Sequence, residues 1–136
     1  MKPAFLAAYA ASAAAIVLTG CGTHARTITG RVATGPVSSA MTVAETDSRF
    51  DGVLDGVSGV NLRIETEQAT GAPAVISETE SGEGGEFTLK LPGNNMPTRA
   101  TVVAEREGYV TARRAVFLPT SGQQLLVLLQ ELAGRR

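Results

Sequence analysis

Short runs in which apolar and polar residues alternate are the feature that most limits how this 136-residue chain can fold. Residues 60–65 (VNLRIE) and 86–91 (EFTLKL) both follow this pattern, with every second side chain apolar. A period of two places successive side chains on opposite faces of a β-strand, so both runs predict half-buried strands. We expect Phe87, Leu89 and Leu91 to point into a hydrophobic core.

Further short strand-like runs follow residue 26. They are separated by turns rich in glycine and proline, such as residues 81–85 and 92–95. The expected strands are residues 27–32, 60–65, 74–79, 86–91, 99–105, 109–118 and 124–130. Short strands separated by turns predict an all-β fold, a seven-stranded Greek-key-like β-sandwich. Residues 37–55 have a mixed pattern and are expected to form an insertion or mobile loop, with a short strand at 41–44 as an alternative.

Residues 125–129 (LLVLL) are the most apolar run after the N-terminal segment. Alternation sends Leu126 and Leu128 to one face of the strand and the other three side chains to the opposite face. A strand with one face in water normally carries polar side chains there. We therefore expect a cover over the second face, either the 37–55 segment or a partner protein.

The N-terminal segment has the pattern of an export signal. A lysine at position 2 precedes an apolar, Ala-rich stretch over residues 5–17, and Leu18-Thr19-Gly20-Cys21 follows. The apolar stretch is too short for a membrane-spanning helix, and its small flanking residues fit a cleavage site. Cys21 is the only cysteine, so an intrachain disulfide is excluded. We expect residues 1–20 to be a signal peptide.

Leu18, Thr19, Gly20 and Cys21 together resemble the lipobox of bacterial lipoproteins. The resemblance implies cleavage before Cys21, S-diacylglycerol on its thiol and N-acylation of the new terminus, with residues 21–26 as a lipidated tether. Two or more acyl chains give stable membrane attachment, which one chain does not. Gly22 stands where this family often has an aspartate that retains the protein in the inner membrane. The expected location is therefore the outer membrane, with the domain facing the periplasm or the cell surface.

The order of motifs in residues 27–130 resembles the carboxypeptidase regulatory-like domain, a transthyretin-like β-sandwich. The residues that carry the resemblance are Gly30 and Val32, Gly59 and Val60 with Leu62, Gly85 and Phe87, and Gly108-Tyr109. Residues 131–136 then form a C-terminal tail. A tyrosine after glycine at a strand corner commonly packs its ring on the core and bonds its hydroxyl to the backbone, and we expect this of Tyr109.

The chain offers no set of residues for catalysis or for a cofactor. Its only histidine, His24, lies in the tether, so no serine triad is expected around it. Clustered Cys and His for a zinc site are also missing. Glu78, Glu80, Glu83 and Glu86 surround the 81–85 turn, where carboxylates could bind Ca²⁺. Alternating glutamates on a solvent-exposed face need no ion, and we expect no metal here.

A formal net charge of −1 and a pI near 5.8 give no reason to expect nucleic acid or an acidic membrane surface as partner. We expect a non-enzymatic, membrane-anchored envelope lipoprotein whose sandwich is a structural or protein-interaction module, with an unidentified envelope protein as partner. One alternative is a glycan-binding module, although aromatic residues make up 4% of the chain and tryptophan is absent. Another is an accessory lipoprotein of a secretion or envelope machine.

Overall fold

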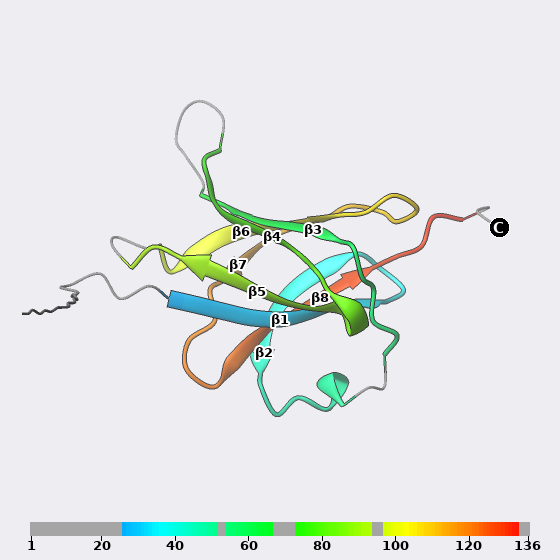
Figure 1. Cartoon of the computed structure of the whole chain (residues 1–136), viewed down its shortest axis with the longest axis horizontal. Coiled ribbons are helices and arrows are strands. Elements are labelled where there is room, and N and C mark those ends of the chain that lie inside the picture. Colours follow the sequence, from blue (N-terminus) through cyan, green and yellow to red (C-terminus); the bar gives the residue numbers. More distant parts are fainter. Residues whose placement is uncertain (1–25, 52–53, 67–72, 94–96, 134–136) are drawn as a thin grey trace, which may run out of the picture.

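A computed structural model describes residues 26–51, 54–66, 73–93 and 97–133. These residues form a β-sandwich of eight strands with two short 3₁₀ turns, η1 (Ser48–Phe50) and η2 (Glu83–Gly85) (Figure 1). The strands are β1 (Arg26–Thr34), β2 (Ser39–Ala44), β3 (Asn61–Glu65), β4 (Val75–Glu80), β5 (Glu86–Leu91), β6 (Arg99–Glu105), β7 (Ala112–Phe117) and β8 (Gln123–Leu129). Within these ranges no helix is long and apolar enough to cross a membrane.

The strands form two four-stranded sheets that pack face to face. Sheet A has the order β2-β8-β1-β5 and sheet B the order β4-β3-β6-β7. All neighbouring strands are antiparallel except β1 and β8, which run parallel. The expected all-β sandwich is therefore present, in two layers.

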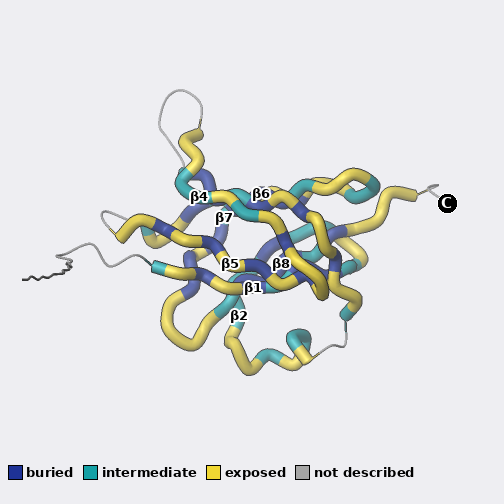
Figure 2. Tube along the Cα trace, in the orientation of Figure 1, coloured by how far each residue is buried: buried dark blue, intermediate teal, exposed yellow. Residues whose placement is uncertain are grey.

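The core lies between the sheets and is made by the apolar side chains that alternation assigned to it (Figure 2). Phe87 is 5% exposed, and Leu89 and Leu91 are fully buried, so the prediction for this strand is confirmed. Leu125 and Val127 of β8 belong to the same core cluster, whereas Leu126 is fully buried outside it. The strand β8 therefore has a buried apolar face on each side, as the sequence indicated.

Two of the glycine motifs meet where β1 pairs with β5. Gly30 is the register partner of Phe87, and a Cβ on Gly30 would lie 2.5 Å from the Cζ of that ring. Gly85, at φ +86°, would place a Cβ 2.1 Å from the backbone oxygen of Val32. Only glycine lets the η2 turn and the Phe87 ring approach β1 this closely.

The prediction of seven strands needs a correction, because the described residues contain eight. The additional strand is β2, which lies inside the 37–55 segment that was expected to be an insertion or mobile loop; it includes residues 41–44, the short strand given as the alternative. β2 pairs along its length with β8 and is the edge strand of sheet A. The alternation of apolar and polar residues in β2 is weak, because its inward-facing positions hold the small residues Ala40 and Thr42. The sequence pattern alone therefore did not decide between a strand and a loop.

The chain between β2 and β3 crosses the outer face of sheet A. Met41, Leu126 and Arg31 form one row across β2, β8 and β1. Arg49 in η1 donates to the Met41 sulfur at 3.5 Å, and Arg31 donates to the Leu54 backbone oxygen at 2.8 Å. The described residues of the segment are thus bonded to both neighbours of Leu126 in the row, and Figure 1 shows these residues beneath β1 and β2. These contacts support this segment as the intramolecular cover that was expected over the apolar face of β8.

Candidate functional site

The predicted lipobox residues Leu18, Thr19, Gly20 and Cys21 lie outside the described residues, which begin with Arg26 at the start of β1. Arg26 pairs with Leu91, and its guanidinium donates to the Pro119 backbone oxygen. We call this end of the sandwich, defined by Arg26, Leu91, Arg99 and Phe117, the N-terminal end. β1 runs from here to the opposite end, on the right in Figure 1, which we call the far end.

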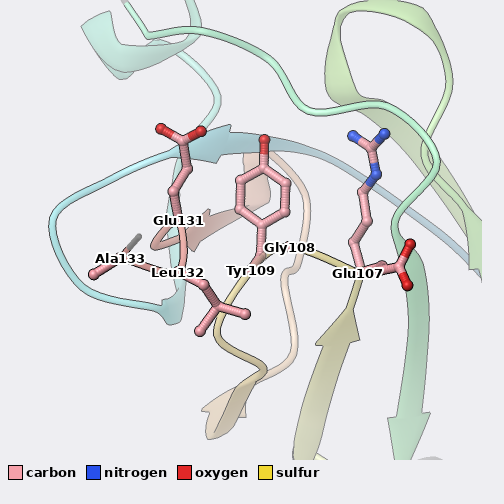
Figure 3. Close-up of a pocket in the computed structure, with 7 residues that line it drawn as sticks. Glu107, Gly108, Tyr109, Glu131, Leu132 and Ala133 are labelled. Atoms are coloured by element: carbon pink, nitrogen blue, oxygen red, sulfur yellow. The ribbon is translucent and has the colours of Figure 1, made fainter. Parts of the chain in front are cut away.

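The far end contains a hollow of about 410 Å³ between the β6–β7 turn and the chain that leaves β8. Its lining residues are Arg106, Glu107, Gly108, Tyr109, Glu131, Leu132 and Ala133. Figure 3 shows that the sandwich places these two segments against each other. The hollow is therefore a product of the tertiary fold, with no single sequence motif behind it.

Backbone hydrogen bonds hold the two segments of the hollow together. Tyr109 and Glu131 form an antiparallel bridge outside the named strands, and the Leu132 amide donates to the Gly108 oxygen at 2.9 Å. Within the turn, the Tyr109 amide donates to the Arg106 oxygen at 3.1 Å, and Gly108 adopts φ +94°. The expected strand at 109–118 is shorter than predicted, because β7 begins at Ala112 and only a bridge remains at Tyr109. These bonds give the hollow a fixed backbone frame before any ligand arrives.

Tyr109 is the central side chain of the hollow. Its ring is partly buried and packs against the hydrophobic core, as expected from the Gly-Tyr motif. The Arg106 guanidinium carbon lies 5.8 Å from the ring centre, within cation–π range. Figure 3 shows the Tyr109 hydroxyl and the Glu131 carboxylate pointing the same way. Among the described residues the hydroxyl makes no hydrogen bond, so the expected bond to the backbone is absent there.

Exposed apolar side chains surround the hollow. Val37 is 63% exposed, Val110 is 37% exposed and Leu132 is 44% exposed. The Ser38 hydroxyl donates to the Val110 oxygen at 2.6 Å and accepts from the Gln130 amide at 2.9 Å, which ties the residue after Val37 to both neighbouring segments. We call Val37, Tyr109, Val110 and Leu132 the far-end patch. Aromatic, arginine and aliphatic side chains gathered around a hollow suit recognition of a partner surface.

Sequence reasoning singled out the Gly108-Tyr109 pair but none of the other residues of this site. Arg106 and Glu107 fell between the expected strands 99–105 and 109–118, and Glu131 and Leu132 fell in the expected C-terminal tail over residues 131–136. Their proximity depends on the pairing of Tyr109 with Glu131, which is a long-range contact. The one local signal was the Gly-Tyr pair at a strand corner.

A second cluster of charged side chains lies on the outer face of sheet B. Glu65 is 6% exposed and accepts from Arg63 at 2.6 Å and from Arg113 at 3.0 Å, while Arg63 also donates to Glu105 at 2.6 Å. The hydrogen bond from Arg63, more than that from Arg113, lowers the pKa of the Glu65 carboxyl. Val103 lies between the two arginines in the register and is fully buried. This cluster covers an apolar residue, which is a structural role.

The glutamates around the η2 turn lie on the solvent side of the sandwich. Glu78, Glu80, Glu83 and Glu86 are all exposed. In the described part of the chain, no group of three or more His, Cys, Asp or Glu side chains is placed to hold a metal ion. The register sets Glu78 opposite Arg63 and Glu86 opposite Arg31, so nearby arginines offset part of their charge.

Comparison of the chain with protein-family models, with curated proteins and with solved structures gives no match in any of the three. A function of the far-end patch and its hollow is therefore inferred from their geometry. Their position relative to the chain's N-terminus is the fact that bears most directly on function.

Proposed function

We propose that this chain is a non-enzymatic, membrane-anchored envelope lipoprotein whose β-sandwich presents a protein-interaction surface to another envelope protein. The anchor is Cys21, after cleavage of residues 1–20 at the Leu-Thr-Gly-Cys lipobox. The interaction surface is the far-end patch. The location that goes with the lipobox and Gly22 is the outer membrane.

The observation that carries this proposal is that the described chain begins at one end of the sandwich and the far-end patch lies at the other. Cys21 precedes Arg26 by five residues, so an acylated Cys21 holds the N-terminal end next to the bilayer. The far-end patch lies at the opposite end, where β1 has crossed the length of sheet A (Figure 1). Exposed Val37, Val110 and Leu132 then face away from the membrane, where a partner can reach them.

We also propose that the domain is a carboxypeptidase regulatory-like, transthyretin-like sandwich of Greek-key character. The contacts of the motif glycines support this proposal. Gly30 lies against Phe87, and Gly85 lies against Val32. Two motifs that are far apart in the sequence thus meet across one strand pair, which gives a packing reason for their glycines.

Site-specific photo-crosslinking in intact cells tests the interaction surface. A photoreactive residue at Leu132, 44% exposed, should form an adduct with a specific envelope protein. The matched control is Val75, which is 51% exposed but lies in β4 near the N-terminal end, where it pairs with Glu65. Equal adducts at both positions, or none at Leu132, would contradict the proposal.

A glycan-binding module is the second candidate, and the hollow itself favours it. The Tyr109 ring offers an apolar face, and Glu131 and Arg106 beside it offer a hydrogen-bond acceptor and donor for sugar hydroxyls. A glycan array probed with the mature domain tests this candidate. Binding that the Tyr109→Ala variant loses would favour the glycan over a protein partner.

A further inference from the structure

Two opposite charges lie next to the Tyr109 ring in the far-end hollow. The Arg106 guanidinium carbon is 5.8 Å from the ring centre. Glu131 is the bridge partner of Tyr109 on the neighbouring segment, so its side chain starts beside the same ring. In the part of the chain that the structure describes, neither Arg106 nor Glu131 takes part in an ion pair. Both charges are therefore available to a ligand that enters the hollow.

Arg106 is held in place by two neighbours. A Cβ on Gly59 would lie 3.8 Å from Arg106 Nε, so the arginine side chain passes next to this glycine. Attraction between the guanidinium and the Tyr109 ring positions it from the other neighbour. An arginine that is already positioned loses less conformational freedom when it binds a ligand. Its planar guanidinium matches a carboxylate, which it can bind through two parallel hydrogen bonds.

Glu131 is positioned by the backbone on both sides of it. The backbones of Gln130 and Leu132 are hydrogen-bonded to the segment between β6 and β7, at 2.8 and 2.9 Å. Figure 3 shows the Glu131 carboxylate pointing the same way as the Tyr109 hydroxyl. A carboxylate and a phenol oxygen can both accept hydrogen bonds from an ammonium group, which is a donor only. This side of the hollow therefore suits a cationic group.

Glu107 also lines the hollow but does not join these groups. Figure 3 shows its carboxylate pointing in a different direction from the Tyr109 hydroxyl and the Glu131 carboxylate. The charges that remain around the ring are one carboxylate and one guanidinium, which balance each other. A ligand with a single charge would leave one of them without a partner, whereas a ligand with both charges satisfies the two together.

We infer that the far-end hollow binds a zwitterion, namely an amino acid or a short peptide with free ends. Glu131 accepts hydrogen bonds from the ligand's ammonium group, Arg106 donates to its carboxylate, and the Tyr109 ring supports the atoms between them. The volume of about 410 Å³ is in the range of small-molecule sites. This inference goes beyond the proposed protein contact, and it requires neither that contact nor the lipid anchor.

NMR titration of the isotope-labelled, purified protein tests this inference, with alanine, Ala-Ala and Ala-Ala-Ala as probes. We expect saturable shifts of the Tyr109 and Leu132 amide signals and of the Arg106 Nε–H signal. The order of the three affinities separates a free amino acid from a peptide as the ligand. N-acetylated and C-amidated forms of the tightest probe each lack one charge. Each should bind at least about threefold more weakly than the unmodified probe, because one of two ion pairs is lost.

Variants then assign each charge of the probe to one side chain. Glu131→Gln should weaken the unmodified probe at least about threefold and leave the N-acetylated probe unaffected, because that probe has no ammonium group. Arg106→Gln should behave in the same way toward the amidated probe. Glu107→Gln is the matched control, and all its affinities should equal those of the wild type.

Three results would overturn the zwitterion site. They are equal affinities for free and capped probes, the absence of saturable shifts with every probe, and equal losses for free and capped probes in the Glu131→Gln variant. Maltose, which is uncharged, serves as a further probe, and shifts equal to those of the peptide would assign the hollow to a glycan instead. Crosslinking at Leu132 tests the protein contact separately, so the two ideas can fail independently.

Discussion

Replacing Leu126 by alanine should destabilise the domain as strongly as a substitution in the sandwich core, although this side chain points away from that core. Leu126 is fully buried, on the outer face of sheet A. A buried Leu→Ala change typically costs about 2–5 kcal/mol, from lost transfer free energy and the cavity left behind. Leu125→Ala, on the core face of the same strand and equally buried, is the matched comparison and should cost about as much.

The free-energy cost of Leu126→Ala is expected to depend on the chain segment between β2 and β3. Arg49 binds Met41 on one flank, and Arg31 binds the Leu54 backbone on the other. If residues 46–53 are replaced by a Gly/Ser linker of equal length, Leu126 becomes exposed before it is mutated. In that background Leu126→Ala should change the unfolding free energy by no more than about 0.5 kcal/mol, as for a surface site. The coupling between loop and side chain is therefore expected to be at least about 1.5 kcal/mol, in the range measured for residues in contact.

Urea unfolding of the mature domain, followed by circular dichroism, measures all four members of this cycle. For a domain of about 100 residues, each kcal/mol corresponds to about 4–8 °C in Tm, so thermal melts give an independent reading. Equal costs of Leu126→Ala with and without the native segment would show that something else covers the leucine. A cost below about 0.5 kcal/mol in the native background would refute its burial.

Three further changes test other parts of the structure. Phe87→Ala should cost about 3–5 kcal/mol in urea unfolding, and an unchanged midpoint would mean that the strand register is wrong. The folded-state pKa of Glu65 is lowered from its ordinary 4.5, so its contribution to stability is complete above that value and lost as pH falls through the lowered pKa. As pH falls below 4.5, the Glu65→Gln variant should therefore lose less stability than the wild type, and an identical loss in both proteins would contradict this role. Cys21→Ser should block signal-peptide processing and abolish labelling with a palmitate analogue, whereas normal processing and labelling would exclude the lipid anchor.

The sequence was informative wherever one face of a strand meets the core and the other meets water. In β5 the alternation of Phe87, Leu89 and Leu91 with polar residues leaves one possible register, because a shift by one residue would bury Lys90. The apolar run of β8 likewise predicted two buried faces, and both are present.

Edge position and long-range pairing explain what the sequence did not reveal. β2 is an edge strand with small inward side chains, so its pattern carries little apolar contrast. The hollow joins Tyr109 to Glu131 through a tertiary bridge, and no local motif encodes that contact.

The two outer faces of this sandwich are sealed by different means, and this directs attention to its ends. On sheet A the segment that follows β2 is bonded to residues on both sides of Leu126, and on sheet B Val103 lies between two arginines that share Glu65. In the described part of the chain the large apolar side chains that are left exposed lie toward one end of the strands or the other: Val37, Val75, Val110, Phe117 and Leu132. A domain that covers its broad faces from within its own chain keeps its ends as the surfaces able to bury further apolar area. If Cys21 anchors one end to the membrane, as proposed, the other end is the surface that remains for a partner.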